Sequence, residues 1–425
     1  MKTVSYKTIQ NWWNGLVIID EIKEYIDPRG SLTELWRTDD ETMCQEQFCP
    51  VMSYWSITKP YVMRGPHQHS KQVDFFYTFK SKMVYQLYNQ ETNEIKHYFT
   101  NPNAITRVKV APPIIHSYRA LEDKDVLSAN FPTSLFMGEN KKSEIDEIRW
   151  EQKFEHNPVI FIFGANGRLG KKLTKTFFDE MGFHEYDVVP CYEKIENNDQ
   201  LQIFIDKLEL LFKGRKLYFF NCAALTNVQD KSTSFDVWEW ANAKLPSHLA
   251  NHCCTNGWKF IGFSTDYVYR EDESNNYIKS KKLFEKIIAN CGNGCVTLIR
   301  VANLYSTDLD DTHNLISKFK NNVKNQVAIS LDPRLSVYPT NVEDLSIKIV
   351  QMFKDGVFTH EEIKYFNIIS KKYNLVEFFN TFFNEPCYSN VSYVVPWDGK
   401  FENDPNATIL NIEGNEKNIQ EIIKR

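Results

Sequence analysis

The stretch Phe161-Ile-Phe-Gly-Ala-Asn-Gly-Arg-Leu-Gly170 decides the fold of this chain of 425 residues. It predicts a buried strand over residues 159–163, a turn punctuated by glycines, and a helix after the turn. Gly164, Gly167 and Gly170 let the backbone turn tightly, approach a pyrophosphate, and pack helix against strand. The start of the helix offers N–H groups to the phosphates. A nucleotide-binding fold therefore begins near residue 157, and the residues before it need a separate explanation.

Strand and helix candidates alternate after that point. Apolar runs predict strands at 159–163, 216–221, 258–264 and 296–301, with helical patterns between them. Continuous apolar runs are typical of a parallel sheet covered on both faces. We therefore predict an α/β Rossmann domain over residues 157–425, ending in a small substrate lobe.

Residues 1–152 have a different pattern. Short strand-like runs recur at 16–19, 51–57, 75–79, 83–87, 95–99, 105–110 and 126–131, separated by turns rich in proline, glycine and asparagine. Many short strands with such turns predict an all-β sandwich or barrel. The chain is therefore expected to be multidomain, with an all-β domain followed by an α/β domain.

Bulk composition excludes several classes of function. A net charge of −5 leaves no electrostatic footprint for nucleic acid. No apolar run is long enough to span a membrane, and the first residues lack the apolar core of a secretion signal. Nine cysteines without a CxxC pair suggest reduced, mostly buried thiols. We expect a cytoplasmic protein with neither a nucleic-acid nor a membrane partner.

Tyr277 and Lys281 lie four residues apart on a predicted helix, so they share one face. A nearby ammonium favours phenolate, and we therefore expect the pKa of Tyr277 to fall toward neutrality. A phenol so tuned can protonate a carbonyl oxygen while a nicotinamide delivers hydride to the carbon. Thr265 ends an upstream strand, where it can donate a hydrogen bond to the same carbonyl.

These motifs, in order GxxGxLG, Asn221-Cys-Ala-Ala-Leu-Thr-Asn-Val-Gln-Asp230, Ser264-Thr-Asp-Tyr-Val-Tyr269 and YxxxK, resemble the dTDP-4-dehydrorhamnose reductases of the extended short-chain dehydrogenase family. The segment 332–344 is similar to that family's late substrate segment. The resemblance implies that Thr265, Tyr277 and Lys281 are catalytic. It also implies a cofactor site formed by Gly164, Asn166, Gly167, Arg168, Leu169, Gly170, Ala223, Ala224, Tyr277 and Lys281.

Two departures from the reductase pattern concern the ligands. Only twelve positions separate Thr265 from Tyr277, about half the usual gap, so a loop near the substrate is missing. The second strand, near Val188, has no clear acidic residue at its end to bind the ribose 2′-hydroxyl of NAD. The expected cofactor is therefore NADPH, with NADH as the alternative and Arg168 as a partner for the 2′-phosphate.

Two histidines in Arg64-Gly-Pro-His-Gln-His69 are separated by one residue, so on a strand both point the same way. Asp74 and His116 can join them, and the set of four then resembles a metal-binding cupin. The other interpretation makes His67 a general base that removes a proton next to a ketone. Both interpretations stay open from the residues alone.

The segments Asp27-Pro-Arg-Gly-Ser-Leu-Thr-Glu-Leu-Trp-Arg37, Arg64-Gly-Pro-His67 and Pro112-Pro-Ile-Ile-His116 resemble the dTDP-4-dehydrorhamnose 3,5-epimerases, a metal-free cupin (jelly-roll) family. The resemblance implies His67 as the base, no metal, and a homodimer formed through the β-domain. It implies that substrate is bound by Arg29, Arg64, Lys71 and His116.

The late strand Val126-Leu-Ser-Ala-Asn-Phe-Pro132 lacks the tyrosine with which this epimerase family returns the proton. Tyr118 or a water is the substitute considered, and Glu151 is the carboxylate considered for orienting His67.

The leading hypothesis is a bifunctional enzyme of nucleotide-sugar biosynthesis. Its first domain would epimerise a nucleoside-diphosphate 4-keto-6-deoxyhexose at C3, or at C3 and C5. Its second would reduce the C4 ketone to an L-rhamnose-type sugar linked to dTDP or UDP. The alternatives are a non-catalytic NADP-binding regulatory protein, a reductase with an inactive sugar-binding cupin, and a metal-dependent cupin fused to a reductase.

Overall fold

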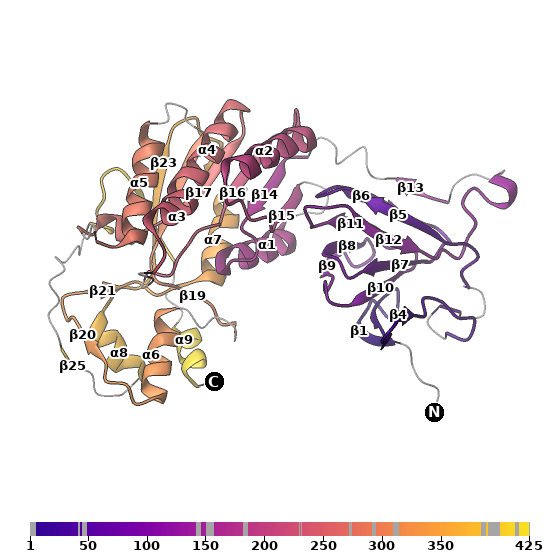
Figure 1. Cartoon of the computed structure of the whole chain (residues 1–425), viewed down its shortest axis with the longest axis horizontal. Coiled ribbons are helices and arrows are strands. Elements are labelled where there is room, and N and C mark those ends of the chain that lie inside the picture. The colour runs from indigo at the N-terminus through magenta and orange to yellow at the C-terminus, as the bar shows by residue number, and fades with distance from the viewer. Residues whose placement is uncertain are drawn as a thin grey trace. The chain divides into compact units, whose positions relative to one another are not determined.

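The computed structural model describes residues 6–40, 43–44, 49–141, 146–149, 157–181, 186–228, 230, 232–271, 274–290, 295–308, 314–383, 388–389, 400–412 and 416–424 (Figure 1). The chain divides into two compact units, Met1–Asn157 with Met181–Val189, and Pro158–Glu180 with Pro190–Arg425. We call the part built from β1 to β13 the β-domain, and the part built from β14 to α9 the α/β domain. Each is described by itself.

The β-domain consists of two antiparallel sheets. One has the order β1-β2-β10-β7-β12-β5 and the other β13-β6-β11-β8-β9, while β3 and β4 form a separate hairpin. The strands are β1 (Tyr6–Trp12), β2 (Val17–Ile22), β3 (Glu24–Asp27), β4 (Gly30–Thr33), β5 (Tyr54–Thr58), β6 (Met63–Gln68), β7 (Asp74–Phe79), β8 (Met83–Asn89), β9 (Glu94–Phe99), β10 (Ile105–Val110), β11 (Ile115–Ala120), β12 (Val126–Asn130) and β13 (Ile148–Arg149), with a short 3₁₀ turn η1 (Glu139–Lys141). The predicted all-β domain is confirmed.

Side chains from both sheets meet in one core. Phe76 on β7 packs against Tyr85 on β8 and Tyr118 on β11, with ring centroids 6.2 and 5.5 Å apart. Val17, Val108 and other fully buried residues complete this cluster. The inner faces of the two sheets therefore contact each other around β7 and β11.

The α/β domain has a seven-stranded sheet of order β15-β14-β16-β17-β18-β23-β26, as the sequence predicts for a Rossmann-type fold. Every strand pairing recorded between β14 and β26 in this sheet is parallel. Its strands are β14 (Val159–Phe163), β15 (Asp187–Cys191), β16 (Leu217–Asn221), β17 (Lys259–Thr265), β18 (Val296–Val301), β23 (Lys364–Ile369) and β26 (Thr408–Asn411). The chain runs from β14 outward to β15 and then returns to β16, so the order reverses between β14 and β16. Ligands of such sheets bind at the carboxyl ends of the strands on either side of that reversal.

The remaining elements of this domain cover the sheet or form the substrate lobe. The helices are α1 (Arg168–Glu180), α2 (Asn198–Phe212), α3 (Phe235–Glu239), the π-helical η3 (Trp240–Lys244), α4 (Leu245–Thr255), η4 (Asp266–Tyr269), α5 (Asn276–Asn290), α6 (Leu315–Lys324), α7 (Val342–Lys354), η5 (Val357–Thr359), α8 (Leu375–Phe383) and α9 (Glu416–Lys424). Short strands are β19 (Leu304–Tyr305), β20 (Ser330–Leu331), β21 (Ser336–Val337), β22 (Thr340–Asn341), β24 (Tyr373–Asn374) and β25 (Tyr388–Ser389). No helix among the described residues is both long and apolar enough to cross a membrane.

Phenylalanines pack the helices onto the two faces of the sheet. Phe161 of β14 contacts Phe204 and Phe212 of α2, with ring centroids 6.1 and 5.8 Å apart. On the other face, Phe177 of α1 contacts Phe220 of β16 at 5.1 Å and Phe353 of α7 at 5.5 Å. The sheet is therefore covered on both sides, which explains the continuous apolar runs in its strands.

The helical pattern between the predicted strands 216–221 and 258–264 forms three consecutive segments, α3, η3 and α4. Within the widened π turn, the buried amide of Asn242 accepts from the Leu225 backbone N–H at 2.8 Å and donates to the Leu225 carbonyl at 3.0 Å. Such π turns often mark functional positions. Here the turn ties α4 to the loop that follows β16.

The cysteines correct an expectation. Cys44 is bonded to Cys49, and Cys254 to Cys295, whereas the sequence suggested reduced thiols throughout. Cys191, Cys222 and Cys253 are free. The pairing of these cysteines depends on the fold, because neither pair has a spacing that identifies it in the sequence.

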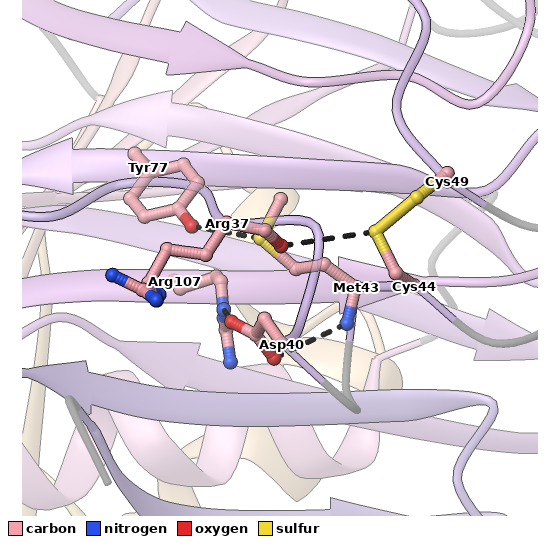
Figure 2. The surroundings of a disulfide bond; sticks show 7 residues. All are labelled: Arg37, Asp40, Met43, Cys44, Cys49, Tyr77 and Arg107. Atoms are coloured by element: carbon pink, nitrogen blue, oxygen red, sulfur yellow. Dashed lines mark hydrogen bonds and ion pairs between the residues drawn. A yellow bond between two sulfur atoms is a disulfide. The ribbon is translucent and has the colours of Figure 1, made fainter. Parts of the chain in front are cut away.

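Cys44, which is bonded to Cys49, donates its backbone N–H to the carbonyl of Asp40, a member of a buried ion-pair cluster (Figure 2). Arg107 is 1% exposed and binds Asp20 at 2.7 Å and Asp40 at 2.6 Å. Met43, the residue before Cys44, is fully buried, and its sulfur accepts a hydrogen bond from Tyr77 at 3.3 Å. A single buried cation therefore pairs with two carboxylates inside the β-domain.

Replacing Arg107 by leucine should destabilise the protein by about 3–5 kcal/mol, because two carboxylates would stay buried without a counter-charge. The matched control is Arg37→Leu, since the Arg37 side chain is 53% exposed and its ion pairs should contribute at most about 1 kcal/mol. Urea titration followed by circular dichroism measures both. Equal losses in the two variants would contradict a structural role for the Arg107 ion pairs.

Candidate functional sites

The glycine turn after β14 lies against the end of β16. Gly164 has a φ of +79°, and a Cβ placed on it would lie 2.5 Å from the Ala223 nitrogen. A Cβ on Gly170 would lie 2.2 Å from the Gly164 carbonyl oxygen. Both positions therefore require glycine, one for its backbone conformation and both for the close approach of the backbone. The resulting turn brings the start of α1 to the point where the strand order reverses.

The residues predicted to bind the cofactor surround this turn, and they differ in exposure. Asn166 and Gly167 are exposed, so their backbone groups are open to a ligand. Leu169 is only 7% exposed and belongs to the core, so it can offer a ligand its backbone N–H rather than its side chain. Ala223 is half-buried and Ala224 is exposed, and both lie just beyond the end of β16. This arrangement suits a phosphate at the N-terminus of α1.

Two charged groups near the expected adenosine end are already engaged. Arg168 donates from Nη1 to the Leu304 carbonyl at 3.1 Å, which directs it toward β19. Glu193, two residues beyond the end of β15, accepts from Lys207 at 2.7 Å. The acidic group nearest that strand end is therefore paired with a lysine of α2, which weakens it as an acceptor for a ribose hydroxyl.

The structure brings Thr265, Tyr277 and Lys281 together. Thr265 ends β17, and Tyr277 and Lys281 lie one turn apart in α5, which packs on that strand. The Tyr277 phenol is hydrogen-bonded to Thr265. Lys281 is 5% exposed and donates from Nζ to the Phe263 carbonyl at 3.0 Å. All three side chains therefore gather at the carboxyl end of the sheet.

The expected effect of Lys281 on Tyr277 is wrong. Burial raises the pKa of the Tyr277 phenol above its ordinary value, and the charges of Asp266 and Tyr267 add to that shift. The hydrogen bond to Thr265 lowers it only in part. Lys281 instead points to the Phe263 carbonyl, and burial lowers its own pKa to about 8 against the charge of Glu285. Tyr277 is therefore a neutral phenol at physiological pH.

Asp266 belongs to the motif that runs from Ser264 to Tyr269, and the sequence alone assigned it no role. It is 1% exposed, and its Oδ1 accepts the hydroxyl proton of Thr265 at 2.9 Å. Burial raises the pKa of Asp266 to about 6, against the charge of Arg270 and the bond from Thr265, so the carboxyl is ionised at neutral pH. Thr265 has one hydroxyl proton, and it is committed to Asp266. The sequence reasoning made Thr265 a donor to the substrate, but the structure directs its hydroxyl proton to Asp266.

Two aromatic rings flank the Tyr277 phenol. Trp238 of α3 and Tyr267 of η4 each contact its ring edge-to-face, with centroids 6.2 and 6.1 Å apart. Trp238 is 1% exposed. These rings fix the orientation of Tyr277 and account for the burial that raises its pKa.

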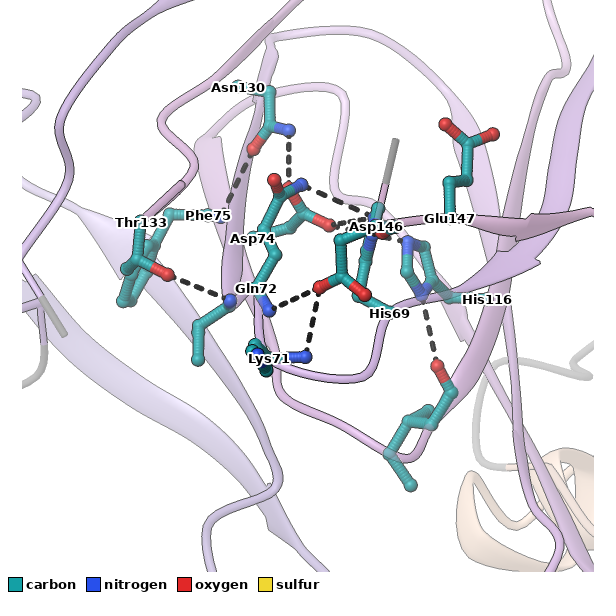
Figure 3. A network of polar contacts seen from close by, with 12 residues as sticks. His69, Lys71, Gln72, Asp74, Phe75, His116, Asn130, Thr133, Asp146 and Glu147 are labelled. Carbon is teal, nitrogen blue, oxygen red and sulfur yellow. Dashed lines mark hydrogen bonds and ion pairs between the residues drawn. The ribbon is translucent and has the colours of Figure 1, made fainter. Parts of the chain in front are cut away.

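A second cluster lies between the two sheets of the β-domain (Figure 3). His67 comes from β6, His116 from β11 and Asp74 from β7, while His69 follows β6 directly. One ligand atom from each of the four lies within 4.8 Å of the others. The set predicted from the sequence as one of two alternatives is therefore assembled, and a metal ion would fit among its nitrogen and oxygen atoms.

Hydrogen bonds outside the cluster decide which atoms point into it. Nδ1 of His116 donates to the Ile114 carbonyl at 3.1 Å, so Nε2 carries a lone pair and lies 3.6 Å from Oδ2 of Asp74. Nδ1 of His69 donates to the Asp146 carbonyl, and its Nε2 lies 3.1 Å from the same Oδ2. Imidazoles held by a backbone carbonyl in this way are typical of metal ligands. A cation has to balance the converging lone pairs, either a proton on His69 or a metal.

Outer contacts hold Asp74 and the loop beside it. Oδ1 of Asp74 accepts from Asn130 at 2.7 Å and from Gln72 at 2.9 Å, which leaves Oδ2 for the histidines. The carboxylate of Asp146 accepts three backbone N–H groups, from Ser70 to Gln72, at 2.9 to 3.2 Å. These bonds outweigh burial and hold the pKa of Asp146 at about 2.

The three histidines differ in protonation. Burial, with the nearby His116 and His69, lowers the pKa of His67 to about 2, so His67 is neutral. Burial also lowers the pKa of His116. For His69 burial works the same way, but the hydrogen bond and charge of Asp74 outweigh it and raise the pKa. His69 is therefore the histidine that takes a proton when no other cation is present.

The other predicted substrate residues of the β-domain lie apart from this cluster or are engaged. Arg29 has a 90% exposed side chain and pairs with Asp27 in the β3–β4 hairpin. Arg64 donates to the Thr58 hydroxyl at 3.0 Å and to the Ile57 carbonyl at 2.8 Å. Lys71 is exposed and contributes its backbone N–H to Asp146. Glu151 lies outside the described residues.

Comparison with known proteins matches the two parts of the chain to different families. Residues 158–397, more than half of the chain, match the family model described as RmlD substrate binding domain. The chain belongs to this family. Residues 25–143 match a second model, the polysaccharide biosynthesis C-terminal domain. The N-terminal region is thus epimerase-like and the C-terminal region reductase-like, as the two resemblances implied.

Individual relatives are distant. A probable low-salt glycan biosynthesis epimerase, Agl13 of Haloferax volcanii, is 26% identical over 134 residues, which covers 30% of this chain and 84% of that protein. The dTDP-4-dehydrorhamnose reductase of Bacillus anthracis, solved in complex with NADP, is 20% identical with a TM-score of 0.46, covering 63% of this chain and 98% of that one. The dTDP-4-dehydrorhamnose 3,5-epimerase of Sulfolobus tokodaii is 15% identical with a TM-score of 0.29, covering 47% of this chain and 94% of that one.

The depressed pKa of Lys281 predicts a pH limit on cofactor binding. As the pH rises through about 8, Lys281 loses its proton. If Lys281 holds the nicotinamide ribose, as the reductase resemblance implies, NADPH affinity should then fall by up to about tenfold per pH unit. Lys281→Arg should remove this loss of affinity at high pH, since a guanidinium stays charged. Fluorescence titration with NADPH at a series of pH values measures the affinity, and Lys282→Arg is the control. An affinity that still falls at high pH in Lys281→Arg would contradict the assignment of Lys281 to the ribose.

Proposed function

We propose that the chain is a bifunctional nucleotide-sugar enzyme. The β-domain epimerises a nucleoside-diphosphate 4-keto-6-deoxyhexose, and the α/β domain reduces its C4 ketone with NADPH to an L-rhamnose-type sugar. The observation that carries the reductase half is the set of Thr265, Tyr277 and Lys281 at the carboxyl end of the parallel sheet. A protein that only bound the dinucleotide would have no need for a buried phenol beside a buried amine.

The reduction needs a hydride and a proton. Bound NADPH would supply the hydride, and the neutral Tyr277 phenol supplies the proton to the C4 oxygen of the substrate. An alkoxide is a stronger base than a phenolate, so the transfer is favourable even though burial raises the pKa of Tyr277. Asp266 and Thr265 hold the phenol oxygen in place. The pairing of Glu193 with Lys207 supports NADPH over NADH, because it weakens the acid that would bind a free 2′-hydroxyl.

The epimerisation begins with removal of an acidic hydrogen beside the ketone. His67 is neutral, has no hydrogen-bond partner among the described residues, and is half-buried, so its ring is available as a base. The remaining cluster offers a positive charge near the enolate oxygen, through the proton that His69 shares with Asp74.

A second candidate mechanism for the β-domain rests on the same cluster. His67, His69, Asp74 and His116 supply the ligand set of a divalent transition metal, and the carbonyls of Asp146 and Ile114 fix two of the imidazoles. A bound metal would polarise the ketone oxygen. In that case His67 would be a ligand, and the base would have to be another group.

Pairing of two chains through the β-domain also belongs to this proposal. Apolar side chains stand exposed on the β3–β4 hairpin and on β5, notably Ile26 at 78%, Leu32 at 63% and Trp55 at 69% exposure. Exposed apolar groups on an edge strand and an isolated hairpin favour a homodimer interface.

The two activities should separate by mutation. With an NDP-4-keto-6-deoxyglucose and NADPH, wild type should oxidise NADPH and yield the reduced sugar by NMR. Tyr277→Phe should lower reduction by at least about 10²-fold while solvent deuterium still enters the substrate. His67→Asn should lose deuterium uptake yet reduce a substrate that has already been epimerised.

Mixing the two variants provides the control for these single substitutions. The mixture should regain product, because the intermediate can diffuse from one intact site to the other. NADPH binding without turnover of any 4-keto sugar would instead favour the regulatory reading. Turnover with no epimerised product would favour a reductase with an inactive cupin.

Metal content decides between the two mechanisms of the β-domain. If the cluster holds a metal, elemental analysis should find about one transition-metal ion per chain, and His69→Gln should lose it while His252→Gln keeps it. Chelation should then abolish deuterium uptake, and adding back Zn²⁺ should restore it. Full deuterium uptake by metal-free protein would leave His67 as the base.

A further inference from the structure

Tyr54 lies near the histidine cluster, on a strand whose sequence pattern indicates no catalytic group. It is in β5, an edge strand, and its direct cross-strand partner in β12 is Asn130. Nδ2 of Asn130 donates both to Tyr54 Oη at 2.9 Å and to Oδ1 of Asp74 at 2.7 Å. One amide therefore connects the phenol to the carboxylate at the centre of the cluster.

The orientation of the Asn130 amide determines where the phenol proton points. Oδ1 of Asn130 accepts the Phe75 N–H at 3.1 Å, so its nitrogen must be the atom that faces Tyr54. Tyr54 Oη is thus an acceptor in that bond and keeps its own proton. Among the described residues this O–H group has no acceptor, and Tyr54 is 44% exposed. The proton is free to be donated to a ligand.

Tyr54 faces inward from the sheet opposite His67. Residues alternate along β5, and Ser56, two positions on, contacts the hydroxyl of Tyr118 on β11 at 3.3 Å. Tyr54 shares that inward face. Its sheet contains β5, β12 and β7, whereas His67 is on β6 of the other sheet. A base and an acid from opposing sheets are placed to act on opposite faces of a sugar ring lying between them.

We propose that Tyr54 is the acid that completes epimerisation, replacing the tyrosine that β12 lacks. The proposal rests on the epimerase function proposed above. The base takes the proton as the C–H bond breaks, and the electron pair forms the enolate. The Tyr54 O–H bond then breaks as a new C–H bond forms on the opposite face. Solvent returns a proton to the phenolate and removes one from the base, so no net charge is left.

The other tyrosine considered for this role is placed differently. Tyr118 is 5% exposed and packs between Phe76 and Tyr85, at 5.5 and 5.7 Å. Its hydroxyl contacts Ser56 within the core. For Tyr54, burial of the phenol raises the pKa to about 12. The phenol therefore stays protonated at neutral pH and can donate its proton to the enolate carbon.

The test separates proton removal from inversion. With the full chain, an NDP-4-keto-6-deoxyglucose and D₂O, without NADPH, Tyr54→Phe should still exchange deuterium at C3 within a few-fold of wild type. The inverted sugar should fall by at least about 10²-fold, because the base returns deuterium to the face it came from. Tyr118→Phe is the matched control and should invert normally.

Three further readouts keep the outcome clear. Reduction of an already epimerised substrate by Tyr54→Phe should match wild type, which shows that the α/β domain is intact, while retained exchange shows that the β-domain is folded. Fluorotyrosine at position 54 has a more acidic phenol. The loss of inversion at alkaline pH should therefore begin at lower pH, while the pH dependence of deuterium exchange should stay the same. Normal inversion by Tyr54→Phe, or loss of inversion in Tyr118→Phe, overturns the role of Tyr54. Absence of exchange in wild type overturns the epimerase function itself, and this proposal with it.

Discussion

Burial of ionisable groups sets the chemistry of both sites. In the α/β domain, removal from water raises the pKa of Tyr277 and of Asp266 and lowers that of Lys281. In the β-domain it keeps His67 and His116 neutral. Each shift favours the uncharged form, as expected where few counter-charges are present. Burial therefore leaves the Tyr277 phenol and the His67 imidazole uncharged at neutral pH, whereas Asp266 is ionised and Lys281 is charged below a pH of about 8.

This constraint changes the account of Tyr277. The spacing of Tyr277 and Lys281 correctly placed both side chains in α5 at the end of the sheet, but it could not show that the amine turns to the Phe263 carbonyl. The committed proton of Thr265 was equally hidden, because it depends on Asp266 being buried and ionised. Short-range sequence spacing predicts which groups meet. The direction of a hydrogen bond depends on all the partners around it.

The fold was largely predictable where periodicity was strong. The apolar runs gave β14, β16, β17 and β18 close to their observed bounds, and the all-β character of the first domain followed from its turns. The disulfides and the π turn at Asn242 were not predicted, since each depends on residues brought together by tertiary packing. The same reason explains Tyr54, whose relation to Asp74 passes through a cross-strand partner 76 positions away.

The two proposed reactions place different geometric demands on the groups that donate and accept protons. The proposed reduction adds a proton and a hydride to one carbonyl, so it would need a rigidly held phenol, and Thr265, Trp238 and Tyr267 contact Tyr277 in a way that holds it. Inversion needs two groups on opposite sides of one carbon, which a single strand cannot supply because its side chains on one face point the same way. A pair of facing sheets can supply them. The sandwich is therefore suited to epimerisation for a geometric reason, and an acid lost from one strand can be replaced from its neighbour without moving the base.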